Sequence, residues 1–251
     1  MRRLNSMVKW IFSFAFVLSF CLRSVALETS SSLTLRYKPR LQESVYSYFS
    51  KAETLFTNLK FQKFVASNSQ AYIGLQTLKT LENGHLIQKA VVQAGNINVN
   101  DQIYAHPSVG KVVEYVLAPW GGIPKAMGTG HQFQVKSFQL VLPKEPISIG
   151  STWSVTIPPN PTFPLPTTLS YEVTNIMGSL VIIHSSVSAE DLAVEGGLSL
   201  TMKGSSQIIF NSEEGLLVRN ESNQYVELRR PNSKGEMSTK MNVNSILELQ
   251  F

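Results

Sequence analysis

Apolar and polar residues alternate with a period of two along most of this chain, and this alternation constrains the fold more than any other feature. The segment "AYIGLQTLKTLENGHLIQKAVVQ" predicts two long strands joined at Asn83-Gly84, a dipeptide typical of two-residue hairpin turns. Glycine, proline, asparagine and serine separate the other alternating segments. Further strands are predicted at 32–38, 111–118, 135–142, 152–157, 168–176, 179–188, 197–210, 215–229 and 237–250.

The expected fold class is therefore all-β, with antiparallel sheets arranged as a curved half-barrel or a sandwich and at most one short helix. That helix is predicted within 49–63, where Phe49, Leu55, Phe56 and Leu59 would line one face. The segment "PPNPTFPLP" at 158–166 holds five prolines and predicts an exposed, stiff connection.

Residues 1–26 are predicted to be a signal peptide. Basic residues precede the apolar run "WIFSFAFVLSFCL", which is short for a membrane span, and "SVA" supplies small residues for cleavage after Ala26. The mature chain would begin at Leu27, and the alternative is an uncleaved membrane anchor. Cys21 is the only cysteine, so it is either removed with the signal or kept as a lipidated N-terminus.

The basic character of the chain lies largely in this signal. Four of the 22 basic residues and none of the 17 acidic residues fall within 1–26, so 18 basic residues face 17 acidic ones after cleavage. A balanced charge removes most of the case for a nucleic-acid partner.

Two stretches of the chain run in step and predict an internal duplication, with a first β module at 27–130 and a second at 131–251. "P-RLQE-SVYSY" from Pro39 parallels "P-ISIG-STWSV" from Pro146, which aligns Tyr46 with Trp153. Trp153 is accordingly predicted to be a core or sheet-face anchor that opens a strand. Three glycines of the first module also match three of the second: Gly84, Gly110 and Gly121 with Gly178, Gly204 and Gly215.

The chain resembles a family of exported bacterial β-proteins that is known as a domain of unknown function. The resemblance covers most of 33–220 and rests on four segments: "LTLRYKPRLQESVYSY", "VGKVVEYVLAPWGGIPKAMG", "LPKEPISIGSTWSV" and "GSSQIIFNSEEGLLVRN". Glu43 departs from the pattern, where a glycine is expected. The resemblance implies export and an antiparallel β fold, and it implies no activity.

Catalytic residues are not predicted, and neither a cofactor nor a metal is expected. The four histidines (His85, His106, His131 and His184) are far apart, and no pair has metal-ligand spacing. The Ser-x-x-Lys spacing of Ser108 and Lys111 lacks the helix and the partner motif of a serine enzyme. The acidic residues Glu190, Asp191 and Glu195 are interpreted as a solvated loop.

The sequence thus predicts a binding or structural protein of the periplasm or cell envelope rather than an enzyme. The expected partner is a hydrophobic small molecule or a lipid, and no single residue is singled out as its ligand. The C-terminal segment "MNVNSILELQF" leaves an alternative open, because Val243, Leu247 and Leu249 alternate before a final Phe251 as in a small outer-membrane β-barrel. A terminal strand with one buried face would show the same alternation.

Overall fold

The computed structural model describes residues 32–39, 45–58, 63–123, 125–127, 140–157, 166–194, 197–230 and 237–250. Within these ranges the chain is all-β, as predicted, and contains no helix. In particular, no described helix has the length and apolar character needed to cross a membrane.

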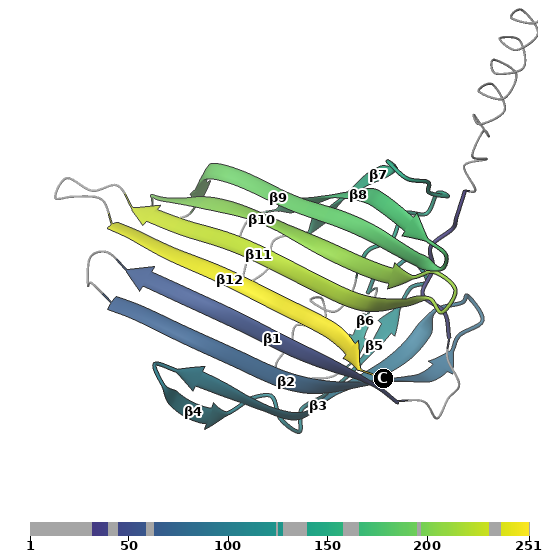
Figure 1. Cartoon of the computed structure of the whole chain (residues 1–251), viewed down its shortest axis with the longest axis horizontal. Helices are drawn as coiled ribbons and strands as arrows, with labels where there is room; N and C mark the ends of the chain where they lie inside the picture. The colour runs from purple at the N-terminus through teal and green to yellow at the C-terminus, as the bar shows by residue number, and fades with distance from the viewer. Residues whose placement is uncertain are drawn as a thin grey trace, which may run out of the picture. The chain divides into compact units, whose positions relative to one another are not determined.

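Twelve strands form one antiparallel sheet across the described residues (Figure 1). The strands are β1 (Val45–Asn58), β2 (Lys63–Thr80), β3 (Leu86–Val99), β4 (Gln102–Ala105), β5 (Val112–Leu117), β6 (Lys125–Met127), β7 (Thr152–Ile157), β8 (Thr167–Met177), β9 (Leu180–Val194), β10 (Leu198–Asn211), β11 (Leu216–Arg230) and β12 (Met237–Gln250). Their order is β6-β5-β3-β2-β1-β12-β11-β10-β9-β8-β7, with β4 added beside β3.

Sequence neighbours are therefore sheet neighbours almost everywhere, and the main exception is the pairing of β1 with β12 near the middle of the order. That ladder runs without a register shift from Ser47 opposite Gln250 to Asn58 opposite Thr239. The sheet is open and curled: β5 and β6 at one edge and β7 and β8 at the other lie behind the long central strands in Figure 1.

The helix predicted within 49–63 is wrong for the described part of that range, since 49–58 belong to β1. This stretch alternates as a strand does. Lys51 and Glu53 point to one side and form an ion pair of 2.7 Å, while Tyr48 on the other side is buried. Both edges of β1 are paired, with β2 and β12, so the backbone hydrogen bonds of two ladders outweigh a weak helical periodicity. Residues 59–62 lie outside the described residues.

Two segments predicted as strands instead form a cap over one end of the sheet. Residues 33–38 and 140–147, here called the end cap, meet at a single antiparallel bridge between Leu33 and Ile147. The prediction of a strand at 32–38 and at 140–142 is therefore wrong, and 135–139 lie outside the described residues. The alternation in 33–38 has another cause: Leu35 and Tyr37 point inward and are 0% and 9% exposed.

The hairpin predicted at Asn83-Gly84 is present between β2 and β3, but its turn is longer than two residues. The strands end at Thr80 and resume at Leu86, and the turn closes through a hydrogen bond of 2.8 Å from the Leu81 N–H to the His85 carbonyl.

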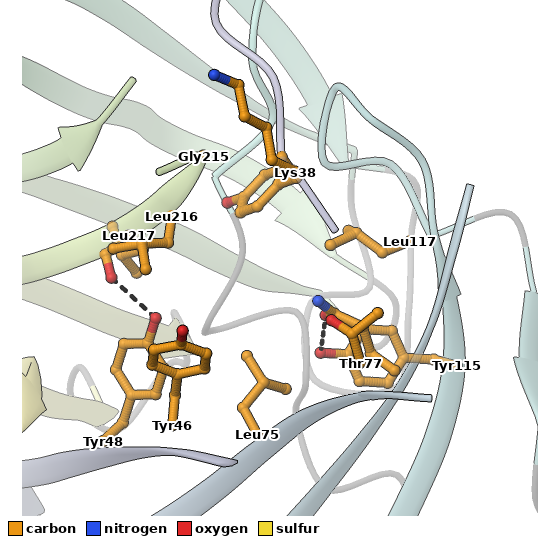
Figure 2. Close-up of a pocket in the computed structure, with 12 residues that line it drawn as sticks. Lys38, Tyr46, Tyr48, Leu75, Thr77, Tyr115, Leu117, Gly215, Leu216 and Leu217 are labelled. Atoms are coloured by element: carbon orange, nitrogen blue, oxygen red, sulfur yellow. Dashed lines mark hydrogen bonds between the residues drawn. The ribbon is translucent and has the colours of Figure 1, made fainter. Parts of the chain in front are cut away.

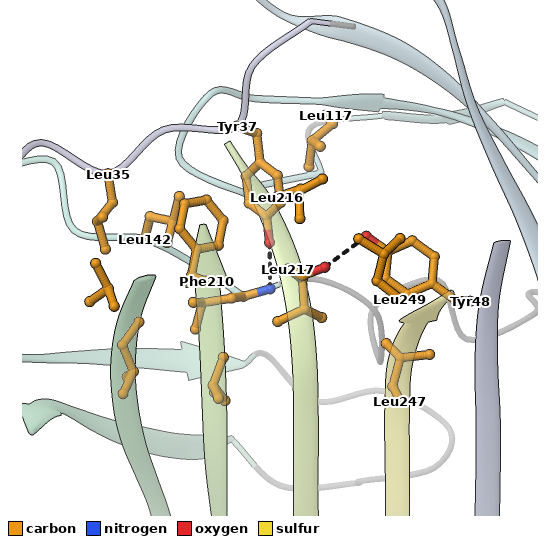
Figure 3. Packing of buried hydrophobic residues seen from close by; sticks show 14 of the residues in the cluster. Leu35, Tyr37, Tyr48, Leu117, Leu142, Phe210, Leu216, Leu217, Leu247 and Leu249 are labelled. Atoms are coloured by element: carbon orange, nitrogen blue, oxygen red, sulfur yellow. Dashed lines mark hydrogen bonds between the residues drawn. The ribbon is translucent and has the colours of Figure 1, made fainter. Parts of the chain in front are cut away.

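The main hydrophobic core lies between the end cap and the nearest half of the sheet (Figure 3). Leu35 and Tyr37 from the cap pack among residues of the sheet, and the Tyr37 ring meets Phe210 edge-on at 5.4 Å between centroids. Leu247 and Leu249 of β12 are 6% and 5% exposed in the same core. The alternation near the C-terminus thus reflects a strand with one buried face.

The predicted duplication stays a prediction. Gly84 and Gly178 both lie in hairpin turns, and Gly121 and Gly215 both follow a strand with φ values of +87° and +65°. Gly204, however, lies inside β10, whereas its predicted counterpart in the first module lies in a turn.

Candidate functional site

Six long strands, in the order β9-β10-β11-β12-β1-β2, supply a regular lattice of side chains. The face of this lattice that carries the core is here called the inner face. Because side chains alternate between faces and pair across strands, each inner-face residue belongs to a row that crosses the sheet. Three kinds of row follow one another along the strands, and they divide the inner face into three zones.

The first zone is the closed end, where the end cap covers the sheet. The cap is fixed mainly through its backbone: the Tyr37 N–H donates to the Pro119 carbonyl at 2.7 Å, and the Leu142 N–H donates to the Trp120 carbonyl at 2.8 Å. Tyr37 also accepts a hydrogen bond from the Leu140 N–H through its hydroxyl, and burial raises the pKa of Tyr37 far above its usual range. Such a hydroxyl stays protonated and acts as a structural link.

A cavity lies within the closed end, and Figure 2 shows it between aromatic side chains. Its volume is about 40 Å³, which is room for a few water molecules and far below the size of an ordinary ligand site. The hydroxyls beside it already have partners: Tyr48 donates to the Leu217 carbonyl at 2.9 Å, and Tyr115 donates to Gln88 at 2.8 Å. The cavity is therefore a packing feature of the core.

The second zone is a row of five serines and one alanine, here called the serine row. Its members stand directly opposite one another on neighbouring strands: Ser185, Ser206, Ser222, Ser245, Ala52 and Ser69. Two hydroxyl pairs join across the strands, Ser185 with Ser206 at 2.5 Å and Ser222 with Ser245 at 2.7 Å. Each pair uses one hydroxyl hydrogen, so the second hydroxyl of the pair still has a hydrogen to donate.

The third zone is apolar again and begins two rows beyond the serine row, past a mixed row that contains Gln224, Thr54 and Ser67. Its clearest part, here called the methionine row, consists of Ala189, Met202, Val226, Met241, Phe56 and Val65. Met202 and its neighbour Leu200 are 5% and 6% exposed, yet neither belongs to the main core cluster. The other side chains of the row are half-buried. The third zone is therefore a second apolar surface on the same face, separated from the core by hydroxyls.

On the core side of the serine row lies another row, here called the row of Asn220, which consists of Ile183, Ile208, Asn220, Leu247, Ser50 and Ala71. From this row to the methionine row, every inner-face position of the six strands is described, and none carries a charged side chain. The opposite, outer face carries the charges instead. Glu227 is the most buried of them at 4% exposure, and hydrogen bonds from Arg229, Ser238 and Tyr225 surround its carboxylate. These hydrogen bonds lower the pKa of Glu227 to about 2, although burial alone would raise it. The hydrogen bond from Arg229 has the largest effect, and those from Ser238 and Tyr225 add to it.

The outer face also has a wide depression of about 480 Å³ over β9, β10, β11, β12 and β1. Its size would suit a small ligand, but its wall carries exposed polar groups, and Lys51 is already paired with Glu53 at 2.7 Å. Glu221 is similarly paired with Arg219 at 3.1 Å. This surface has the character of the solvated side of a sheet.

The residues that the sequence singled out are placed as follows. Trp153 anchors the sheet to the cap, as predicted: its ring stacks on Tyr171 at 5.0 Å and its indole N–H donates to the Val141 carbonyl at 2.9 Å. His85, in the turn between β2 and β3, is half-buried with its ring edge-on to Trp120. The interpretation of Glu190 and Asp191 as a loop is wrong, since both lie on β9, where Glu190 pairs with Lys203 at 2.5 Å.

Other predicted positions contribute no cluster. His131, Glu195 and the side chain of Asp191 lie outside what the structure describes. Among the described residues, no group of three or more histidine, cysteine or carboxylate side chains is arranged to hold a metal ion. The structure does not bring His85, His106 and His184 together into such a group.

Comparisons with known proteins identify the fold and no family. Neither a protein-family model nor a curated protein sequence matches the chain. Seven solved chains resemble it in structure. One of them, from a structure described as lipid–protein interactions in lipovitellin, aligns with a TM-score of 0.51 at 10% sequence identity.

The alignment covers 82% of this chain but only 25% of the lipovitellin chain. At this level of identity the likeness is one of fold. The chain is thus an all-β protein with a single curled antiparallel sheet of a kind also found within lipovitellin.

Proposed function

We propose that this chain is an exported binding protein that holds a hydrophobic ligand of the lipid class against the third zone of its inner face. The observation that carries the proposal is the methionine row, an apolar surface that lies outside the main core cluster and is only half-buried over most of its length. A core surface would be covered, and an ordinary outer surface would be polar.

The physical gain from an apolar ligand on this surface is large enough for binding. Burial of apolar area contributes about 25 cal/mol per Å², so covering ~200 Å² of the protein would contribute about 5 kcal/mol before ordering costs. Met202 and Met241 suit such a role, because the flexible thioether side chain adapts to ligands of different shape. The lipovitellin structure, which was described for its lipid–protein interactions, shares the fold and is compatible with this assignment.

The proposal also includes export to the periplasm or cell envelope, and this part of it is supported by the sequence alone. The signal-like residues 1–26, with cleavage after Ala26, support it, as does the resemblance to exported bacterial β-proteins. Catalysis is not part of the proposal.

A charge placed in the methionine row tests the binding site. Met241→Glu puts a carboxylate on the inner face, while Asn242→Glu puts the same carboxylate on the outer face one residue away, where the side chain is exposed. The purified mature protein is freed of bound lipid and titrated with a fluorescent fatty-acyl probe.

We expect wild type and Asn242→Glu to bind the probe with equal affinity and Met241→Glu to lose at least tenfold, with all three showing the same circular dichroism spectrum. Binding that is absent in wild type, or that is weakened equally by both variants, contradicts the proposal. Native mass spectrometry of the protein isolated from its own host gives an independent readout, since a copurified lipid would appear as an added mass.

A further inference from the structure

One polar atom on the inner face has no partner among the described residues, and it lies next to the serine row. The side-chain carbonyl oxygen of Asn220 is buried and accepts no hydrogen bond from the part of the chain that the structure describes. Asn220 stands opposite Ile208 on β10 and Leu247 on β12, both of which belong to the core. An unsatisfied buried carbonyl costs about 1–3 kcal/mol, so a chain that keeps one at this place gains if a ligand supplies the missing donor.

Hydroxyl groups stand beside this carbonyl in the next row. Ser222 follows Asn220 by two residues on β11, so the two side chains share the inner face about 7 Å apart along the strand. Ser222 and Ser245 form one of the two hydroxyl pairs, at 2.7 Å. Together the amide carbonyl and the hydroxyl pair offer an acceptor and a donor within reach of one small polar group.

The charge of that polar group follows from its surroundings. From the row of Asn220 to the methionine row, every inner-face side chain of the six strands is neutral, and most are apolar. A phosphate or carboxylate placed there would lose its hydration without gaining a cation, which is costly. A hydroxyl would lose little and would satisfy the Asn220 carbonyl.

We propose that the ligand is a neutral lipid with a hydroxyl-bearing head, of the monoacylglycerol or fatty-alcohol class, and that Asn220 and Ser222 bind its head. The hydroxyl of the head donates to the Asn220 carbonyl and accepts from the serine pair. Its hydrocarbon chain runs from the serine row toward Val226 and Met241, which begin ~13 Å farther along the strand. This inference rests on the proposed function and adds the class of lipid and the residues that select it.

Selectivity between lipids with one acyl chain and different heads tests the proposal. Delipidated mature protein is titrated at pH 8 with 1-oleoylglycerol, with oleate and with 1-oleoyl-lysophosphatidic acid, each below its micelle concentration. We expect 1-oleoylglycerol to bind at least tenfold more tightly than either anion. Asn220→Leu, which keeps the branched shape of the side chain and removes the carbonyl, should weaken 1-oleoylglycerol binding about fivefold, the effect of one neutral hydrogen bond.

The matched control is Asn223→Leu, since Asn223 lies on the same strand with its side chain exposed on the outer face. It should leave the affinity for 1-oleoylglycerol unchanged. A purely structural role for Asn220 would lower the affinity for all three lipids alike, so the readout is the ratio between 1-oleoylglycerol and oleate. That ratio should fall in Asn220→Leu and in Ser222→Ala, and should stay constant in Asn223→Leu.

The outcomes separate the two proposals. If wild type binds all three lipids equally, or prefers an anion, the assignment of the neutral head is wrong while the lipid-binding function stands. If the ratio is the same in wild type and in Asn220→Leu, Asn220 does not bind the head. If wild type binds none of the three lipids and no fatty-acyl probe, both proposals fall.

Discussion

Gly121 supports the end cap, and replacing it with alanine should uncouple the cap from the sheet. Its φ of +87° lies in the left-handed region, which costs a residue other than glycine about 1–2 kcal/mol. A Cβ at this position would also lie 2.0 Å from the Leu140 carbonyl oxygen, so the backbone of the cap must move. That movement strains the Leu142–Trp120 hydrogen bond, worth about 1 kcal/mol, and partly uncovers Leu140, for about 1–2 kcal/mol more.

Gly121→Ala should therefore lower the free energy of unfolding by about 3–5 kcal/mol. Gly178→Ala is the matched control: Gly178 has a φ of +61°, but no atom of the described residues lies within 4 Å of an added Cβ. It should lose only the backbone contribution of about 1–2 kcal/mol.

Urea denaturation followed by tryptophan fluorescence measures both variants. Residues 27–251 contain two tryptophans, Trp120 and Trp153, and both contact or border the cap. Equal losses in the two variants would show that the close approach to Leu140 has no energetic consequence, and the account of the cap would be wrong.

Three further predictions concern other parts of the chain. Trp153→Phe keeps a ring on Tyr171 but loses the hydrogen bond to the Val141 carbonyl, so unfolding free energy should fall by about 1 kcal/mol in urea, and a null effect would contradict this role. The pKa of Glu227 is depressed from 4.5 to about 2, so its stabilisation is complete above pH 4.5 and is lost as the pH falls toward 2. The urea midpoints of wild type and Glu227→Gln should accordingly differ at pH 7 and converge near pH 2; a gap that widens in acid would reverse the assignment. Mass spectrometry of exported protein should show an N-terminus at residue 27 without an acyl group, and a diacylglycerol adduct on residue 21 would refute it.

The β class and most strand positions could be predicted, because a strand with one buried face imposes a period of two on its own sequence. The predicted strand at 152–157 coincides with β7, and the one at 237–250 coincides with β12. The same period misled at 33–38, where Leu35 and Tyr37 alternate because they pack into the core. Periodicity reports which side chains are buried, and it does not report whether the backbone has a ladder partner.

The candidate site could not be predicted in the same way, because a row across a sheet is set by register. Ser185 and Ser206 are 21 residues apart in sequence, and Ser222 and Ser245 are 23 apart, yet each pair stands side by side. A bulge between Leu200 and Met202 shifts the pairing of β10 with β9, so even correct strand boundaries would misplace the methionine row. The sequence does show serines that alternate with apolar residues. Without the strand pairing, however, this pattern does not indicate which serines stand side by side.

We expect the closed end of the inner face to determine the stability of the fold and the third zone to determine ligand binding. The end cap, its hydrogen bonds and the main core cluster all lie at the closed end, while Met202 and Leu200 lie outside that cluster. The serine row between them has small side chains that pack little, so a change on one side has few contacts through which to disturb the other. Substitutions at Met241 should therefore change ligand affinity with little loss of unfolding free energy, whereas Gly121→Ala should do the reverse. Because of this separation, ligand binding at the third zone can be tested in a protein that stays folded. If Met241→Glu unfolded the cap, the closed end and the third zone would instead form one continuous core.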